Sequence, residues 1–461
     1  MFSQKQQIAL VLLVALVFRV GVLIIVHNST AIDQNGLHSR AIHSDAWDYL
    51  ITGQNIAERG KFSLQTSEPF EPDFTRTPGY PLLIAVAYVL SGGTHNITLI
   101  IAIQLLLSLV TVWLVIRIGR SLFSHAVGVI AGLLIAVAPA TLVFVGGIGN
   151  ETLLALCIMV LLELSIRLFR ASGPHMWGYA FAIGLLAAFA AYVRPIALIY
   201  IVFLLVAIVA LKSPRRKAVL VSGTILAVFL IGVLPWYFRN YMLSGVSTFS
   251  SISGGNLLIY NVGAVEARRQ GISLREARDQ LWVEFDRRMA DLNYETYNNA
   301  EAAIIQQQIA FEHILEHPVQ SALFQSTAAL NSLRPGYSTI MLLLHLPGHD
   351  LVSFRYRMWQ GDMSALQDLA LFEGAVVLLV TLYYGCLYGL TLIGGVLLIK
   401  RRRWDAILLF GLTAFWFLYA PGDAGNSRFR VPVEGIFALV AAVGAVWLWQ
   451  VAPRVLRRLR S

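Results

Sequence analysis

Long apolar stretches recur along most of this chain and constrain its fold more than any other feature of the sequence. About 18 consecutive apolar residues are enough to cross a bilayer as a helix. Candidate spans are residues 8–26, 97–116, 126–146, 152–169, 177–193, 195–211, 218–236, 376–399, 404–420 and 434–452. A further stretch, 80–92, is ambiguous by length. The sequence therefore predicts an all-α polytopic membrane protein with 10 or 11 transmembrane helices.

The composition supports this class. Hydrophobic residues make up 57% of the 461 residues and charged residues only 13%, whereas soluble domains carry about 25% charged residues. Cys157 and Cys386 both lie inside apolar stretches without paired spacing, so they predict neither a disulfide framework nor a metal site. The first apolar run lacks a convincing cleavage site, and we expect a retained helix rather than a signal peptide.

The net charge of +9 is concentrated in short clusters at 212–217, 400–403 and 454–460. Basic clusters beside apolar spans mark the cytoplasmic side and meet anionic lipid headgroups, so we infer membrane lipids as partners and no nucleic acid. This orientation places the loops 27–79, 146–151, 192–195, 236–370 and 421–432 outside. One conflict stays open, because if Arg117 and Arg120 are inside, 80–92 and 97–116 cannot both be full crossings. Either the short run is re-entrant or one basic cluster breaks the rule.

The long polar segments divide the chain into three parts. Residues 1–263 form a transmembrane part with the outside loop 27–79, and residues 371–461 form C-terminal transmembrane helices with a basic cytoplasmic tail. Residues 264–370 lie between them as an extracytoplasmic segment, in which charges alternate with apolar residues at helical spacing. That pattern is typical of solvated amphipathic or interfacial helices. His313 and His317 could share a metal at i, i+4, but without a matching third ligand nearby we predict no metal site.

Two acidic sites fall in the outside loops. In a helix beginning near Ser44, Asp45, Asp48 and Tyr49 would share one face. Glu151 lies in the turn GGIGNETL between two apolar stretches. Both sites have a purely structural alternative: Asp45 could cap its helix, and Glu151 could face a helix dipole beside an Asn150 cap. Glu151 could otherwise orient an acceptor, pair with an arginine or bind a metal.

Arginines at outer helix ends are less expected under the positive-inside rule. They occur in Arg194-Pro195, in PWYFRN with Arg239 and Asn240, and in SRFRVP with Arg428, while Arg76 precedes TPGYP with Tyr80. A lipid-linked phosphate would explain them, because a guanidinium forms a bidentate fork with phosphate. Snorkelling to headgroups is the alternative. Arg19 lies inside the first apolar stretch, and we expect it to face the bundle and find a partner there.

These motifs, taken in chain order, resemble the polyprenyl-phosphate-sugar-dependent glycosyltransferases of the GT-C superfamily, in the protein-mannosyltransferase-like and aminoarabinose-transferase-like branch. The resemblance covers about 30–240 and 404–440. It rests on the Asp45 loop, TPGYP, Asn150-Glu151-Thr152, Arg194-Pro195, PWYFRN and SRFRVP. One departure is Asp45-Ala46 in place of the paired Asp-Glu of eukaryotic protein mannosyltransferases. Protein O-mannosylation is therefore not implied, and the bacterial lipid- or polysaccharide-modifying branch fits better.

The resemblance implies a GT-C-type bundle with juxtamembrane helices in its extracytoplasmic loops and its catalytic module in residues 1–263. It implies inverting transfer of a hexosyl or pentosyl group from a polyprenyl-phosphate donor to an extracytoplasmic lipid, glycan or protein acceptor. We expect Asp45 as the base, with Asp48 as second candidate and Glu151 as second acid. The expected donor-phosphate ligands are Arg76, Arg194, Arg239, Arg428, Tyr80 and Asn240. We expect no dedicated cofactor, leave a divalent cation open, and expect a bacterial inner membrane with the site facing the periplasm.

Two other classes stay open. A transporter or flippase of lipid-linked sugars would show internal repeats and broken helices with midplane polar residues, and the sequence displays neither. A polysaccharide ligase or polymerase would also use outer-loop arginines, but that class normally carries its long functional loop late in the chain and lacks an acidic first loop. Either reading would gain support if Asp45 proved dispensable.

Overall fold

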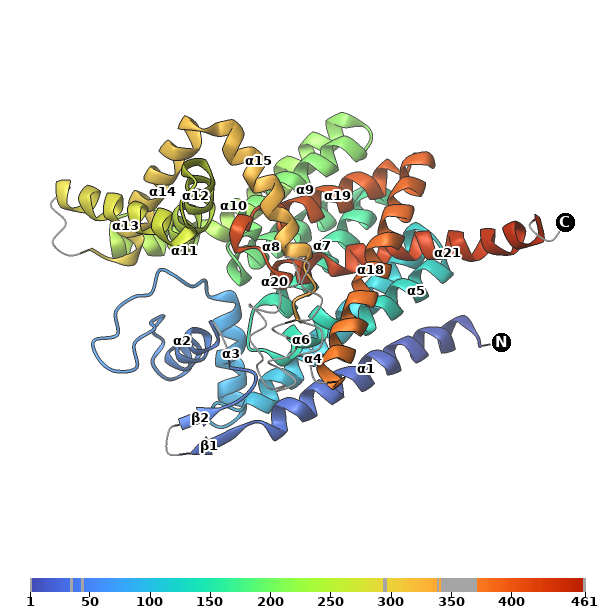
Figure 1. Ribbon diagram of the computed structural model, residues 1–461, viewed down its shortest axis with the longest axis horizontal. Helices are drawn as coiled ribbons and strands as arrows, with labels where there is room; N and C mark the ends of the chain where they lie inside the picture. The colour runs from blue at the N-terminus through green and yellow to red at the C-terminus, as the bar shows by residue number, and fades with distance from the viewer. Residues whose placement is uncertain are drawn as a thin grey trace.

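The computed structural model describes residues 2–33, 36–42, 45–292, 297–337, 340 and 371–458. Within these residues the chain is almost entirely helical (Figure 1). Strands β1 (Ala31–Asp33) and β2 (Gly36–His38) form a short antiparallel hairpin that begins the loop 27–79. The predicted all-α polytopic class is confirmed.

Seven helices of the described residues are long and apolar enough to cross a membrane. They are α1 (Gln4–Asn28), α4 (Ile97–Leu122), α7 (Glu151–Arg170), α8 (Pro174–Val193), α10 (Arg215–Ser244), α18 (Leu371–Lys400) and α21 (Glu434–Arg458). Two consecutive helices, α5 (His125–Ala136) and α6 (Pro139–Gly146), qualify only as a pair, bent by 51°. The bend corrects the expectation of one continuous span over 126–146. Pro139 has no N–H to continue the helical hydrogen bonds, so a new helix begins there.

Among the described residues, seven helices, or up to eight with the bent pair, are long enough to span a membrane, compared with 10 or 11 predicted spans. The remaining predicted stretches do form apolar helices, but short ones: α3 (Gly79–Leu90), α9 (Ala197–Leu211) and α19 (Trp404–Tyr419). At 1.5 Å per residue, the 12 residues of α3 extend about 18 Å, well short of the roughly 30 Å hydrocarbon core. Helix α9 starts only after Arg194-Pro195, where the proline disfavours helix in the residue before it.

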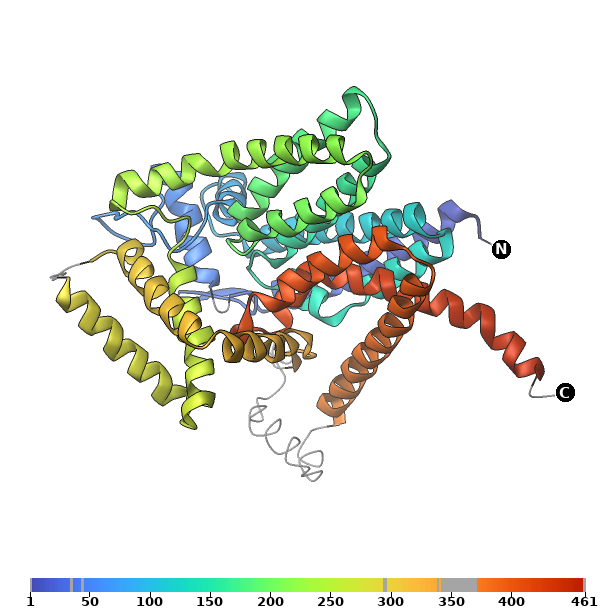
Figure 2. The same cartoon turned by 90° about the horizontal axis from the view of Figure 1, so that it is seen from above.

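Polar and basic segments gather at opposite ends of the bundle (Figures 1 and 2). One end holds the hairpin, α2 (Ala46–Arg59) and the polar helices that follow α10. Both chain termini lie at the other end, toward which the turns from α9 to α10 and from α18 to α19 also point. These two turns carry the basic clusters 212–217 and 400–403. The loops predicted to lie outside and the basic clusters are thus separated by the length of the bundle.

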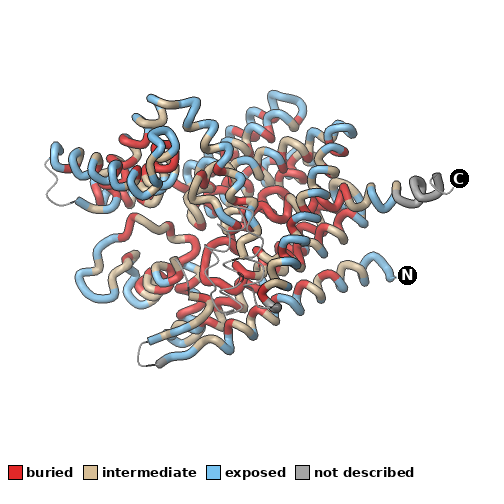
Figure 3. Tube along the Cα trace, in the orientation of Figure 1, coloured by how far each residue is buried: buried red, intermediate tan, exposed pale blue. Residues whose placement is uncertain are grey.

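The polar segment after α10 folds into a small lobe with its own core. It comprises α11 (Ile252–Gly255), the π-helix η1 (Asn256–Val262), α12 (Gly263–Gln270), α13 (Leu274–Asp291) and α14 (Asn299–Glu316). Leu258, Phe285 and Ile309 are among its buried residues, and Figure 3 shows buried positions along the facing sides of these helices. Helix α15 (Pro318–Ala328) and the turn η2 (Ala329–Leu333) lead back to the bundle. The rest of the expected extracytoplasmic segment, from 341 to 370, lies outside the described residues.

Arg19 faces the interior of the bundle, as expected. It is fully buried, and its Nε donates to Ser108 Oγ at 2.9 Å while Nη1 donates to the Ala136 carbonyl at 3.0 Å. These bonds join α1 to α4 and to the end of α5, so Arg19 has a structural role.

Candidate active site

Asp45 lies at the N-cap position of α2, but its side chain makes no capping hydrogen bond. Instead, its carboxylate contacts two arginines from other parts of the chain. Oδ1 lies 2.9 Å from Arg76 Nη2, and Oδ2 accepts from Arg428 Nη1 at 2.8 Å. The capping alternative therefore does not describe this residue. Ser44, near which the helix was expected to begin, lies outside the described residues.

Arg76 joins the acidic face of α2. Its Nη2 lies 2.6 Å and its Nε 3.0 Å from Asp48 Oδ2, and its guanidinium lies 5.4 Å above the Tyr49 ring. Asp45, Asp48 and Tyr49 thus share one side of α2, as their spacing predicts. The backbone N–H of Arg76 is held by Asp73 Oδ2 at 2.9 Å, which fixes the approach of this arginine.

Glu151 is the first residue of α7 and is only 1% exposed. Its Oε1 lies 3.3 Å from Arg194 Nη1 and also accepts from Arg428 Nε. Asn150 sits at the N-cap position without a side-chain capping bond; its Nδ2 donates to Tyr49 Oη at 2.9 Å and to the Val193 carbonyl at 3.1 Å. Of the roles left open for Glu151, the structure shows the pairing with arginine.

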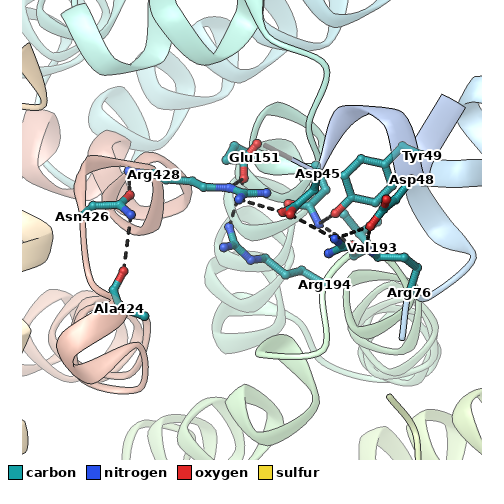
Figure 4. Close-up of polar contacts among 11 residues, drawn as sticks. Asp45, Asp48, Tyr49, Arg76, Glu151, Val193, Arg194, Ala424, Asn426 and Arg428 are labelled. Carbon is teal, nitrogen blue, oxygen red and sulfur yellow. Dashed lines mark hydrogen bonds and ion pairs between the residues drawn. The ribbon is translucent and has the colours of Figure 1, made fainter. Parts of the chain in front are cut away.

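Arg428 connects the two acidic sites. It lies on α20 (Ser427–Arg430), a short helix just before α21, and reaches between Asp45 and Glu151 (Figure 4). Arg194 lies beside it with its guanidinium 4.3 Å from the Phe429 ring. Three carboxylates and three guanidiniums thus meet at the polar end of the bundle, and we call them the charged cluster: Asp45, Asp48, Glu151, Arg76, Arg194 and Arg428.

Tyr80 and Gln104 hold the turn that carries Glu151. Tyr80 is fully buried; its Oη accepts from the Gly149 N–H at 3.0 Å and donates to Gln104 Oε1 at 2.7 Å. Gln104 Nε2 in turn donates to the carbonyls of Val145 and Gly147 at 2.9 and 2.8 Å. Sequence reasoning did not single out Gln104, although an amide inside the apolar stretch 97–116 is a usable signal for a buried polar contact.

Arg239 and Asn240 lie behind the cluster. Arg239 Nη1 donates to the Asp73 carbonyl at 2.8 Å, and the guanidinium packs against Phe62, Phe74 and Trp236. Asn240 is fully buried and donates to the Thr248 carbonyl at 2.8 Å. Arg239 therefore supports the backbone leading to Arg76, and Asn240 supports the chain just after α10. By contrast, the three predicted acids Asp45, Asp48 and Glu151 contact Arg428 or Arg76 directly.

Charge pairing keeps Asp45 ionised. Burial raises the pKa of its carboxyl, but the positive charges of Arg428 and Arg76 lower it by more, so the pKa lies below the usual range of an aspartate. The carboxylate is therefore the form present at neutral pH. Among the described residues, no group of three or more His, Cys, Asp or Glu side chains is arranged to hold a metal ion.

Comparison with known proteins gives a partial family match. Residues 75–238, a little over a third of the chain, match the family model of dolichyl-phosphate-mannose-protein mannosyltransferases. This segment includes TPGYP, Glu151 and Arg194. No curated protein sequence matches the chain.

Solved structures show the same fold. The oligosaccharyltransferase AglB of Archaeoglobus fulgidus, in complex with an inhibitory peptide and a dolichol-phosphate, overlaps with a TM-score of 0.54 at 16% identity, over 99% of this chain and 52% of that one. The same archaeal enzyme tethered to an acceptor peptide with the NVT sequon gives 0.52 at 15% identity, over 96% and 50%. ArnT from Cupriavidus metallidurans, bound to undecaprenyl phosphate, gives 0.45 at 14%, over 98% and 80%.

The chain spans about half the length of the archaeal oligosaccharyltransferase, which it covers to 52%. The fold over nearly the whole chain and the family match over 75–238 together confirm the predicted resemblance to the GT-C superfamily and its mannosyltransferase-like branch.

Proposed function

We propose that this protein is an integral-membrane glycosyltransferase that moves a sugar from a polyprenyl-phosphate donor to an acceptor outside the cytoplasm, with Asp45 as the base. The observation that carries the proposal is Arg428, which lies between Asp45 and Glu151 with a contact to each. A base and phosphate-binding cations are the two elements that such a transfer requires. The charged cluster supplies both in one place.

The proposed reaction is a single displacement. Asp45 takes the proton of the acceptor hydroxyl, the acceptor oxygen bonds to the anomeric carbon, and the bond from that carbon to the phosphate oxygen breaks. The anomeric configuration inverts because attack and departure are on opposite sides. Arg428 and Arg76 stabilise the charge on the departing polyprenyl phosphate, since guanidinium–phosphate hydrogen bonds are bidentate and charge-assisted.

The arginine contacts of Asp45 suggest how the donor prepares the base. Three carboxylates balance three guanidiniums in the charged cluster. A donor phosphate brings further negative charge and competes for Arg428 and Arg76. Each arginine bond that shifts from Asp45 to the phosphate frees a carboxylate lone pair for the acceptor proton and raises the pKa of Asp45 towards a more useful value.

The comparisons support the donor class. The matching family model is named for dolichyl-phosphate-mannose as donor, and AglB was solved with a dolichol-phosphate. For this chain we propose a polyprenyl-phosphate donor and a lipid, glycan or protein acceptor. The proposed location is the bacterial inner membrane with the charged cluster facing the periplasm, in keeping with the separation of polar loops and basic turns.

A donor panel tests the proposal. Purified protein in lipid is supplied with radiolabelled hexosyl and pentosyl polyprenyl phosphates and with membrane lipid, glycan and peptide acceptors, with and without EDTA. We expect label to enter an acceptor fraction from one donor class, with an inverted anomeric configuration by NMR. Loss of transfer in EDTA would add a divalent cation to the account. Donor binding without transfer to any acceptor, together with movement of the donor across vesicles, would favour the flippase alternative.

A further inference from the structure

A second candidate site lies at the far end of the bundle from the charged cluster. A partly open cavity of ≈ 220 Å³ lies where the ends of four helices meet. Leu122 is the last residue of α4, Arg170 of α7 and Leu211 of α9, and Asp405 is in the first turn of α19. Ile166, Phe169 and Leu409 complete its lining. Because Glu151 begins and Arg170 ends the 20-residue helix α7, about 30 Å separate the two sites.

Two guanidiniums flank the same short stretch beside this cavity. Arg170 donates from Nη1 to Ser121 Oγ at 2.7 Å and from Nη2 to the Ser121 carbonyl at 2.8 Å. Arg403 lies 5.0 Å above the Phe123 ring and pairs with Asp405 at 2.9 Å and 2.7 Å through Nε and Nη2. A guanidinium carries five N–H donors, so these contacts leave Nε of Arg170 and Nη1 of Arg403 available to a ligand.

Positive charge exceeds negative charge around the cavity. Lys212 follows Leu211 and donates from Nζ to the Leu168 carbonyl at 2.7 Å. About one turn before the ends of α4 and α7, Arg117 and Arg167 both pair with Glu163. Their Nε atoms lie 2.9 and 2.8 Å from Glu163 Oε1. The charges of this region are therefore five cations (Arg117, Arg167, Arg170, Lys212 and Arg403) against two acids (Glu163 and Asp405).

We propose that this cavity binds an anionic phospholipid, with the start of an acyl chain against Leu122, Phe169 and Leu409 and the headgroup phosphate at Arg170 and Arg403. A soluble anion would gain nothing from the apolar wall, and a zwitterionic lipid would gain little from the excess of positive charge. Basic pockets between transmembrane helices are where anionic headgroups bind in membrane proteins. The site is independent of the proposed transferase activity.

Native mass spectrometry of the full-length protein tests the site. Phosphatidylglycerol is titrated against phosphatidylcholine for the wild type, for Arg170→Gln/Arg403→Gln, and for Arg215→Gln/Arg216→Gln. The last variant is the matched control, because Arg215 and Arg216 are exposed in the turn at the same end and their removal changes the net charge equally. We expect one phosphatidylglycerol to bind at least tenfold more tightly than phosphatidylcholine, the cavity variant to lose roughly tenfold, and the control to keep the preference.

A second variant keeps every charge, so its effect on lipid binding does not depend on removing arginines that could also support the fold. Leu409 is buried in the lining, so Leu409→Phe should fill the cavity and weaken phosphatidylglycerol binding in a folded protein. Equal losses in the cavity and control variants would show a diffuse surface effect and overturn the site. So would equal binding of phosphatidylcholine, or unchanged binding in Leu409→Phe. Displacement of the lipid by millimolar inorganic phosphate would show a plain phosphate site instead of a lipid site.

Discussion

Arg428 Nη1 lies 2.8 Å from Asp45 Oδ2, although 383 residues separate the two along the chain. The contact joins the loop 27–79 to the turn before α21. A site built this way exists only when the whole bundle has folded, because neither element carries the full set of charges. Removing Arg428 should therefore affect the site and the fold together.

The first prediction concerns Arg428 itself. Arg428→Gln should weaken binding of polyprenyl phosphate at least tenfold, because a charge-assisted bidentate contact is lost. It should also lower thermal stability, since Glu151 is 1% exposed and loses one of its two arginine partners. Arg428→Lys keeps the charge and should recover part of the stability but less of the binding. Unchanged lipid-phosphate binding in a folded Arg428→Gln protein would contradict the assigned role.

The second prediction compares two glutamates on the same helix. Glu151 and Glu163 both lie on α7 and both pair with arginines, one at each end of the bundle. Glu151→Gln should reduce transfer on the order of a hundredfold, because Arg194 and Arg428 lose the carboxylate that holds them in place. Glu163→Gln should leave transfer within a few-fold of wild type. The measurement is initial transfer rate per folded protein, and similar losses in both variants would point to a general effect on the fold.

The third prediction is a pH dependence in the small lobe formed by the helices α11 to α14. His313 bridges two helices: Nδ1 lies 3.3 Å from Glu266 Oε1 and Nε2 lies 3.1 Å from Glu284 Oε2. Burial lowers the pKa of His313, but Glu284 and Glu266 raise it by more, so it lies above its usual value. The pKa of Glu266 is lowered to about 2. Burial raises it, but hydrogen bonds from Arg269, Gln270 and His313 lower it by more.

Folding raises the pKa of His313, so protonated His313 stabilises the folded lobe. This contribution is fully present below about pH 6.5 and is lost as pH rises through the pKa of the folded state. Hydrogen exchange in α14 should therefore accelerate as pH rises above about 6.5, beyond the intrinsic pH effect. His313→Gln should exchange faster at pH 6 and show no such transition. If exchange in the wild type changed with pH only as the intrinsic exchange rate does, the stabilising role of His313 between Glu266 and Glu284 would be refuted.

The fourth prediction concerns a buried ion pair next to Arg428. Arg430 is fully buried; its Nη1 donates to the carbonyls of Ser332 and Arg334 at 3.2 and 2.8 Å and to Tyr388 Oη at 2.9 Å. Its Nε lies 3.5 Å from Glu434 Oε2. Arg430→Met should cost about 3–5 kcal/mol of stability, because Glu434 would remain as an unpaired buried charge.

Replacing both Arg430 and Glu434 should recover most of the lost stability. Arg430→Met/Glu434→Leu removes the unpaired charge, so thermal unfolding should return towards wild type. Donor binding should nevertheless stay weaker, because the bonds that hold α20 and Arg428 against residues 332–334 are gone. Arg19→Met, a buried arginine in another part of the bundle, should lower stability without changing donor affinity. A double variant no more stable than the single one would refute the ion-pair explanation.

Much of the fold was predictable because it depends on local hydrophobicity. Every predicted apolar stretch is helical in the structure, and the short run at 80–92 is the short helix α3. The bend at Pro139 was not predicted, because apolar composition sets helix formation but not where a proline divides a helix. Helices α9 and α19 lie within the predicted stretches 195–211 and 404–420. The core of the small lobe was also missed, since its alternating charges conceal helix faces that become buried only against each other.

The sequence indicated the residues of the charged cluster, but not how they pair. Local spacing placed Asp45, Asp48 and Tyr49 on one face, and motifs indicated Glu151 and Arg428. No pattern could show that Arg428 contacts both acids, since that depends on how distant helices pack. For the same reason the sequence could not distinguish Arg239 from Arg428, since each is next to an aromatic residue. In the structure Arg239 packs among aromatic rings behind the cluster.

The most direct test of the account is transfer by Asp45→Asn, measured beside wild type and Asp48→Asn with the donor that the panel identifies. The amide keeps the size of the side chain but cannot take the acceptor proton. We predict that Asp45→Asn loses at least a hundredfold in transfer rate while it still folds and binds polyprenyl phosphate, and that Asp48→Asn retains most of its activity. Transfer by Asp45→Asn at the wild-type rate would contradict the central claim that Asp45 is the base.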